Sequence, residues 1–164
     1  MPHVFVSIGS NIDKDKNVVT AVRELHRCYA PLTLSNVYES IAFGFAGENF
    51  YNLVAGFDTE DTVMDVAKRL TNIELASGRV RDGKNNDPRT LDIDLLLYGD
   101  LTRHDEHIDV PRSEIAEYAF VLRPLAEIAP ALRHPETGLS IQQMWEDFAD
   151  RDQQLWSVPL DFGL

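Results

Sequence analysis

The stretch from residue 88 to residue 98 constrains this chain most, because two carboxylates interrupt what is otherwise a buried strand. In a β-strand, residues i and i+2 point to the same face. Asp92 and Asp94 therefore share one face. The other face is lined by apolar residues, namely Leu91, Ile93, Leu95 and Leu97. Neighbouring acids repel each other unless a cation compensates them, and Mg²⁺ prefers carboxylate oxygens. The pair predicts a magnesium site, but it is also typical of the water-facing side of an antiparallel sheet.

The overall charge limits which partners are possible. The chain has 164 residues, 44% of them hydrophobic, so we expect one domain over residues 1–164 with a substantial core. A net charge of −12 argues against a general affinity for nucleic acid or anionic membrane, whose phosphates would be repelled. Cys28 is the only cysteine, which excludes an internal disulfide and a cysteine metal cluster.

The expected location follows from what the first residues lack. Residues 1–6 contain neither the basic region nor the long apolar stretch of a signal peptide. No segment approaches the length of a membrane span. We expect a cytoplasmic protein, monomeric, without nucleic-acid or membrane partners.

Basic residues gather just before the acid pair. Arg79, Arg81, Lys84 and Arg89 lie within eleven residues of a chain that has only 15 lysines and arginines. Residues 82–87 between them are polar and contain a glycine, which is typical of a loop. A solvated loop carries such charges too, but arginines beside an acid pair favour a metal–phosphate site.

A segment rich in aromatic rings and amides precedes the third expected strand. Residues 41–52 combine glycines with four rings and two side-chain amides. Single rings such as Phe43 are typical of a loop folded back on the core. Phe50 and Asn52, spaced i and i+2 at the start of the strand, fit a planar ligand held by stacking and hydrogen bonds.

The order of the expected elements predicts the fold class. Hydrophobic periodicity predicts strands over residues 4–8, 32–40, 53–57 and 91–98 and helices over residues 18–29 and 63–73. This is the βαββαβ order of an α+β, ferredoxin-like fold, an antiparallel sheet with helices on one face and the other face free for a site. Extra C-terminal helices are expected: a short helix or turn pair over residues 119–130 and a short helix over residues 140–148, followed by an irregular tail.

Two features leave alternatives open at this point. His104 and His107 lie in a stretch that we interpret as a solvated hairpin rather than a metal site, because no cysteine or third histidine is near. Ferredoxin-like sheets also bind RNA through exposed aromatic residues, so the topology alone assigns no function.

The chain resembles the 6-hydroxymethyl-7,8-dihydropterin pyrophosphokinases of folate biosynthesis along nearly its whole length. The segments that carry the resemblance are Ile8-Gly9-Ser10-Asn11, Tyr51-Asn52, Ile73-Glu74 with Gly78-Arg79-Val80-Arg81, the long motif over residues 88–96, and residues 120–130. The resemblance implies a ferredoxin-like enzyme that transfers pyrophosphate from ATP, its co-substrate, to the hydroxymethyl group of a reduced pterin and releases AMP.

The resemblance also implies roles for individual residues. Asp92 and Asp94 would hold two magnesium ions, and Arg79 and Arg89 would neutralise the triphosphate during catalysis. The other nucleotide-binding residues would be Glu74, Arg81 and Arg112. Asn52 would recognise the edge of the pterin and Phe120 would stack on its ring, with Ser40, Phe43 and Phe50 enclosing it. The loop over residues 82–87 would close over both substrates.

Five positions depart from the family's pattern. Arg112 stands where the family usually carries His, and Tyr118 where it usually carries Arg. Asn86 replaces a frequent Trp, and Ile41-Ala42 replaces a common Pro-Pro. Arg112 keeps a cation, whereas Tyr118 supplies none. A divergent relative that binds a pterin-like ligand with altered or absent turnover is therefore the competing hypothesis.

Overall fold

The computed structural model describes residues 1–41, 48–77, 91–149 and 152–164. The first part of the chain forms β1 (His3–Ser10), α1 (Lys14–Tyr29), β2 (Thr33–Leu34), β3 (Val37–Ser40), β4 (Phe50–Asp58), α2 (Val63–Ala76) and β5 (Asp92–Tyr98). The remainder forms β6 (Arg103–His104), β7 (Asp109–Val110), α3 (Glu114–Glu117), α4 (Ala119–Ile128), α5 (Ile141–Glu146) and β8 (Leu155–Val158).

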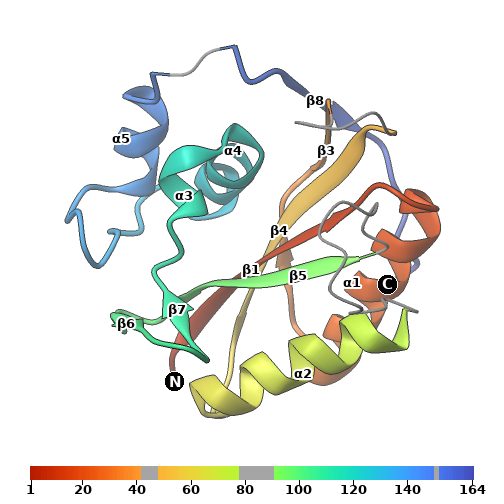
Figure 1. The fold of residues 1–164 in the computed structure, drawn as a ribbon, viewed down its shortest axis with the longest axis horizontal. Helices are drawn as coiled ribbons and strands as arrows, with labels where there is room; N and C mark the ends of the chain where they lie inside the picture. Colours follow the sequence, from red (N-terminus) through yellow and green to blue (C-terminus); the bar gives the residue numbers. More distant parts are fainter. Residues whose placement is uncertain (42–47, 78–90, 150–151) are drawn as a thin grey trace.

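The strands pair in the order β5-β1-β4-β3-β8, with β2 also on β4, and every pairing is antiparallel (Figure 1). With β2 and β3 taken as one broken strand, the expected order of strand, helix, strand, strand, helix, strand is present. The prediction of an antiparallel ferredoxin-like α+β fold with additional C-terminal helices is therefore confirmed.

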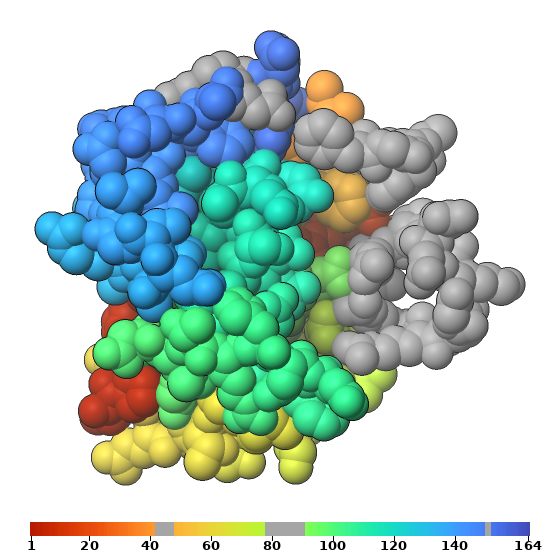
Figure 2. Space-filling model, turned by 60° about the vertical axis from the view of Figure 1, so that its left-hand side comes forward, coloured from red at the N-terminus to blue at the C-terminus, as the bar shows by residue number. Residues whose placement is uncertain are grey.

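Each face of the sheet carries its own apolar core. One core joins α1 and α2 to one face through buried residues that include Val22, Leu70 and Ile8. The second core joins α3, α4 and α5 to the opposite face through buried residues that include Val54 and Leu122. In Figure 2 this second layer, in teal and blue, lies beside the green region that contains β6 and β7. The face opposite α1 and α2 was expected to be free for a site, but α3, α4 and α5 cover part of it.

A bulge in β5 changes the expected alternation. Phe5 lies opposite Leu97, but the next residue, Val6, lies opposite Leu95, so Leu96 is an extra residue on β5. Leu96 and Leu97 consequently both belong to the second core, whereas Leu95 belongs to the first. The prediction that Leu97 shares a face with Ile93 and Leu95 was wrong, because strict alternation ends at the bulge.

The strands also differ from the sequence prediction in a division, an earlier start and an additional strand. The strand expected over residues 32–40 is divided where the Ser35 hydroxyl oxygen accepts the backbone N–H of Val54 at 2.9 Å. β4 begins at Phe50, so Phe50 and Asn52 lie within the strand. The tail was expected to be irregular, but Leu155–Val158 pairs with β3 as β8. Pairing at the end of a sheet depends on what lies beside a segment, and local periodicity does not record it.

The C-terminal helices follow their sequence signals. Ser140 caps α5, because its hydroxyl oxygen accepts the backbone N–H of Gln143 at 3.1 Å. Residues 119–128 form α4, with Pro124 inside the helix. Among the described residues, none of the helices is long and apolar enough to cross a membrane.

Candidate active site

The register of the sheet brings the expected metal and pterin residues onto one face. Gly9 lies directly opposite Asp92 on β5 and directly opposite Asn52 on β4. Residues directly opposite each other on antiparallel strands point to the same side. The adjoining row, made of Ile8, Ile93 and Leu53, is buried in the core with α1 and α2. Asp92 and Asn52 therefore point away from those helices.

The neighbouring positions extend this face. Asp94 lies opposite Ser7, which also lies opposite Val54 of the second core. Ser40 lies opposite Phe50, two residues before Asn52. Strand alternation thus places all the described residues of the predicted metal pair and the predicted β3–β4 pterin contacts on the face that also carries α4.

Gly9 is a part of this site, although the sequence alone gave it no role in binding. A Cβ atom at Gly9 would lie 2.5 Å from Oδ1 of Asn52, closer than real Cβ contacts come. The Asn52 side chain therefore lies over Gly9, and Asn52 is only 5% exposed. A glycine at this position makes the close approach possible.

The acid pair is accessible and lies beside a cation. The Asp94 side chain is 42% exposed, and its Oδ1 lies 3.8 Å from Nη2 of Arg112. The backbone N–H of Arg112 donates to the carbonyl oxygen of Leu96 in the β5 bulge at 3.0 Å. The bulge therefore anchors the segment after β7 next to Asp94.

The donor set fits magnesium shared with a phosphate ligand. Asp92 and Asp94 present carboxylate oxygens on one face, and both residues are partly exposed. In the described part of the chain, no group of three or more His, Cys, Asp or Glu residues is arranged to hold a metal ion. Mg²⁺ is commonly bound by one or two carboxylates, with water and substrate phosphates completing the octahedron. The pair fits this mode and not a closed protein cage.

Glu74 supports the strand that carries the acid pair. Its side chain is buried with 4% exposure, and Oε2 accepts the backbone N–H of Ile93 at 3.1 Å. β5 lies at one end of the strand order, so this bond ties α2 to an end strand between Asp92 and Asp94. The expected contact between Glu74 and the nucleotide stays a prediction.

Phe120 lies in the first turn of α4 and stacks on Tyr118. Their ring centroids are 5.0 Å apart with an interplanar angle of 19°. Both residues are partly exposed. Tyr118, which departs from the family's arginine, therefore supports the ring that is expected to stack on the pterin.

A polar cluster that the sequence did not indicate attaches α4 to the sheet. The Tyr38 hydroxyl donates to Oε1 of Glu127 at 2.6 Å, and the backbone N–H of Asn36 donates to Oε2 at 2.7 Å. Arg123 lies 5.0 Å from the centroid of the Tyr38 ring. Burial and the Glu127 carboxylate both raise the pKa of Tyr38, so its hydroxyl stays protonated and remains a donor. Tyr38 lies directly opposite Asn52, so this cluster sets the position of α4 relative to the site.

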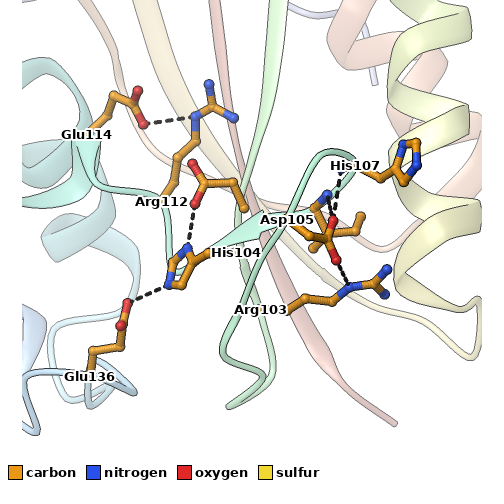
Figure 3. A network of polar contacts seen from close by, with 9 residues as sticks. Arg103, His104, Asp105, His107, Arg112, Glu114 and Glu136 are labelled. Carbon is orange, nitrogen blue, oxygen red and sulfur yellow. Dashed lines mark hydrogen bonds and ion pairs between the residues drawn. The ribbon is translucent and has the colours of Figure 1, made fainter.

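The hairpin of β6 and β7 confirms the solvated hairpin expected around His104. His104 lies between Asp109, 2.5 Å from Nδ1, and Glu136, 3.1 Å from Nε2 (Figure 3). The hydrogen bond to Asp109 and the nearby Glu136 raise the pKa of His104. These contacts join the hairpin to the segment between α4 and α5.

Several predicted site residues lie outside the described residues. They are Phe43, Arg79, Arg81 and Arg89, together with the loop over residues 82–87 and Asn86 within it. Their roles in binding and catalysis stay predictions.

Comparison with solved structures defines the fold class. The chain superposes on Plasmodium falciparum HPPK-DHPS crystallised with pteroate with a TM-score of 0.67. The match covers 92% of this chain and 43% of that chain, at 11% sequence identity. A second structure, HPPK-DHPS in complex with substrates, gives a TM-score of 0.70 and covers 90% of this chain and 44% of that chain at 12% identity. This chain is therefore an α+β protein with the ferredoxin-like fold of those proteins, and it spans less than half of their length.

Sequence comparison then identifies the family. Residues 5–130 match the family model described as 7,8-dihydro-6-hydroxymethylpterin-pyrophosphokinase (HPPK). The chain belongs to this family.

Named relatives agree with that assignment. The 2-amino-4-hydroxy-6-hydroxymethyldihydropteridine pyrophosphokinase of Pseudomonas aeruginosa is 37% identical over 142 residues, which covers 81% of this chain and 84% of the relative. The protein of the same name from Aquifex aeolicus is 32% identical over 137 residues, which covers 82% of this chain and 85% of that protein. The folic acid synthesis protein fol1 of Pneumocystis carinii is 33% identical over 152 residues, which covers 91% of this chain but only 20% of that protein.

Proposed function

We propose that this chain transfers a pyrophosphoryl group from ATP to the hydroxymethyl group of 6-hydroxymethyl-7,8-dihydropterin and releases AMP, a step of folate biosynthesis. Membership of the pyrophosphokinase family over residues 5–130 supports this reaction. The observation that carries it is the row in which Asp92 and Asn52 flank Gly9 on one face of the sheet.

The spacing of that row suits the two substrates. Neighbouring strands are separated by 4.7–4.9 Å, so Asp92 and Asn52, two strands apart, are separated by about 10 Å. A bicyclic pterin with its hydroxymethyl group is comparable in length. With its polar edge at Asn52, the pterin directs its hydroxyl group toward the carboxylates, where the phosphates of ATP would lie.

Each side chain contributes positioning or charge. Asp92 and Asp94 would hold two magnesium ions, which neutralise phosphate oxygens and orient them when bound. Phe120 would stack on the pterin ring, and Ser40 and Phe50 would line the same face. Arg79, Arg81 and Arg89 match the family's motif and would neutralise the triphosphate, and Glu74 and Arg112 would complete the nucleotide side.

The proposal extends to residues 1–164 as one domain. The pairing of β8 with β3 supports this extension, because it joins the C-terminal segment to the sheet that carries the site. The cytoplasmic location and the monomeric state stay predictions of the sequence.

Product analysis tests the proposed reaction. The purified protein is mixed with ATP, Mg²⁺ and 6-hydroxymethyl-7,8-dihydropterin, and nucleotides and pterins are separated by chromatography. We expect AMP and pterin diphosphate in equal amounts, and loss of both when EDTA removes the metal. Formation of ADP, or no turnover, would contradict the proposal. Tight pterin binding in calorimetry without AMP formation would favour a divergent binding protein instead.

A further inference from the structure

Arg112 contacts two acids through two nitrogen atoms of its guanidinium group. Nε lies 2.9 Å from Oε2 of Glu114, and Nη2 lies 3.8 Å from Oδ1 of Asp94. Figure 3 shows Arg112 reaching the Glu114 carboxylate from the segment that follows the hairpin. The guanidinium therefore joins a residue of α3 to one of the two expected metal ligands.

The two contacts differ in kind. Nε of Arg112 and Oε2 of Glu114 are both buried, and neither atom makes a hydrogen bond of good geometry in the described structure, so their close contact is an ion pair. The Asp94 contact is longer than a hydrogen bond, and the Asp94 side chain is 42% exposed. The Glu114 contact is suited to hold Arg112 in place, and the Asp94 contact is suited to exchange.

The backbone fixes Arg112 at this position. Its N–H donates to the carbonyl oxygen of Leu96 at 3.0 Å, and its own carbonyl oxygen accepts the N–H of Ile115 at 3.2 Å. Because the main chain is tied to the β5 bulge on one side and to α3 on the other, a change of partner requires only the outer end of the side chain to move.

We propose that Arg112 is a resident counter-ion of Asp94 that disfavours free divalent cations and turns to phosphate when the metal arrives with ATP. A guanidinium near Asp94 opposes a bare cation there through like-charge repulsion. The triphosphate supplies oxygens that a planar guanidinium binds well, so the same side chain favours the metal–nucleotide complex. This inference rests on the proposed function and assigns Arg112 a further role in it, the coupling of metal binding to nucleotide binding.

Metal titration without nucleotide tests the inference directly. Mn²⁺ takes the same oxygen ligands as Mg²⁺, and its free form is measured by electron paramagnetic resonance. In R112Q we expect the affinity for Mn²⁺ alone to rise about two- to fivefold, the range of partly exposed charge pairs. The affinity for Mn²⁺ with ATP should fall by a similar factor. Unchanged Mn²⁺ affinity, or a change of the same sign in both titrations, would overturn the inference.

The matched control is R103Q, which removes the same charge from the hairpin that precedes Arg112. Arg103 contacts Asp105 at 2.5 Å instead of Asp94. We expect R103Q to change both affinities by less than half as much as R112Q. An equal effect would show that overall charge, and not the contact with Asp94, is responsible.

Two further variants keep the test decisive. R112K retains the charge but cannot span Glu114 and Asp94, so its Mn²⁺ affinity should lie between those of wild type and R112Q; it replaces R112Q if circular dichroism shows that R112Q is unfolded. In an E114Q background the effect of R112Q should shrink, because Arg112 is no longer oriented. If R112Q changes the Mn²⁺ affinity equally in the wild-type and E114Q backgrounds, Glu114 does not orient Arg112.

The two proposals fail separately. A wild-type protein that forms no AMP contradicts the proposed function, whereas the nucleotide-free Mn²⁺ titration still decides the counter-ion role. If the wild-type protein forms AMP normally and wild type and R112Q bind Mn²⁺ with the same affinity, only the role of Arg112 is overturned.

Discussion

The two halves of the site are built in different ways. In the acidic half, Asp94 is 42% exposed and is positioned by its place in the strand ladder. In the amide–aromatic half, Asn52 is 5% exposed and lies over Gly9, while Phe120 stacks on Tyr118. An accessible carboxylate can be removed with little effect on stability, because it does not pack against the core. A buried side chain such as Asn52 contributes to packing, so its removal also affects stability. Substitutions in the two halves should therefore affect activity and stability in different proportions.

The largest effect on activity is expected from D94A. Removal of an expected ligand of the metal that would neutralise the phosphates should lower the rate of AMP formation by about 10³-fold. The side chain is not in either core, so the free energy of unfolding should change by no more than about 0.5 kcal/mol. Steady-state kinetics and urea unfolding measure the two quantities. D100A, which removes an exposed acid in the turn after β5, is the control and should retain activity. Near-normal turnover of D94A would rule out its metal role.

E74A, also in the acidic half, should lower the free energy of unfolding more than D94A does. It leaves the buried N–H of Ile93 without its acceptor, which costs about 1–3 kcal/mol. E74Q keeps an acceptor oxygen of the same length and should lose less. Urea unfolding compares the pair. Equal stability of E74A and wild type would show that the bond to Ile93 does not hold β5.

G9A should disrupt the amide half. The added Cβ displaces Asn52, so KM for the pterin should rise about tenfold, which is about 1.4 kcal/mol, while KM for ATP stays near its original value. The double variant G9A/N52A relieves the overlap and should recover stability but not pterin affinity. Equal changes in both KM values would mean that the two halves are not separate.

The smallest effect is expected at Tyr118. Y118L removes the aromatic pair with Phe120, which is worth about 0.5–1.5 kcal/mol, so pterin affinity should fall about two- to tenfold. Y118F keeps the stack and serves as the control. Y118R restores the family's cation, and its affinity for ATP should rise while its affinity for pterin falls. Fluorescence or calorimetric titration with each ligand separates these effects. Parallel changes for both ligands would contradict the assignment of Tyr118 to the pterin half.

Local patterns in the sequence were sufficient for much of the fold. The helical stripe of α1, the alternation of β5 up to Leu95 and the cap at Ser140 are properties of neighbouring residues, so periodicity and capping rules detect them. The long motif over residues 88–96 is likewise contiguous, and it indicated the family that residues 5–130 match.

The features that the sequence did not indicate depend on residues distant in the chain. The Leu96 bulge appears only when β5 is set against β1, and β8 only when the tail meets β3. The residues next to Gly9 in the sequence do not show that the Asn52 side chain lies over it. Likewise, the residues next to Tyr38 do not indicate its hydrogen bond to Glu127. Such contacts arise from packing between elements.

The sequence by itself determined the type of fold, the acid pair and the family, because each is encoded in the order and spacing of adjacent residues. The tertiary structure decided how the halves of the site meet: register places Asp92, Gly9 and Asn52 in one row, and the bulge brings Arg112 beside Asp94. Register and crossing contacts depend on which surfaces are buried together, and that is settled only when the whole chain packs.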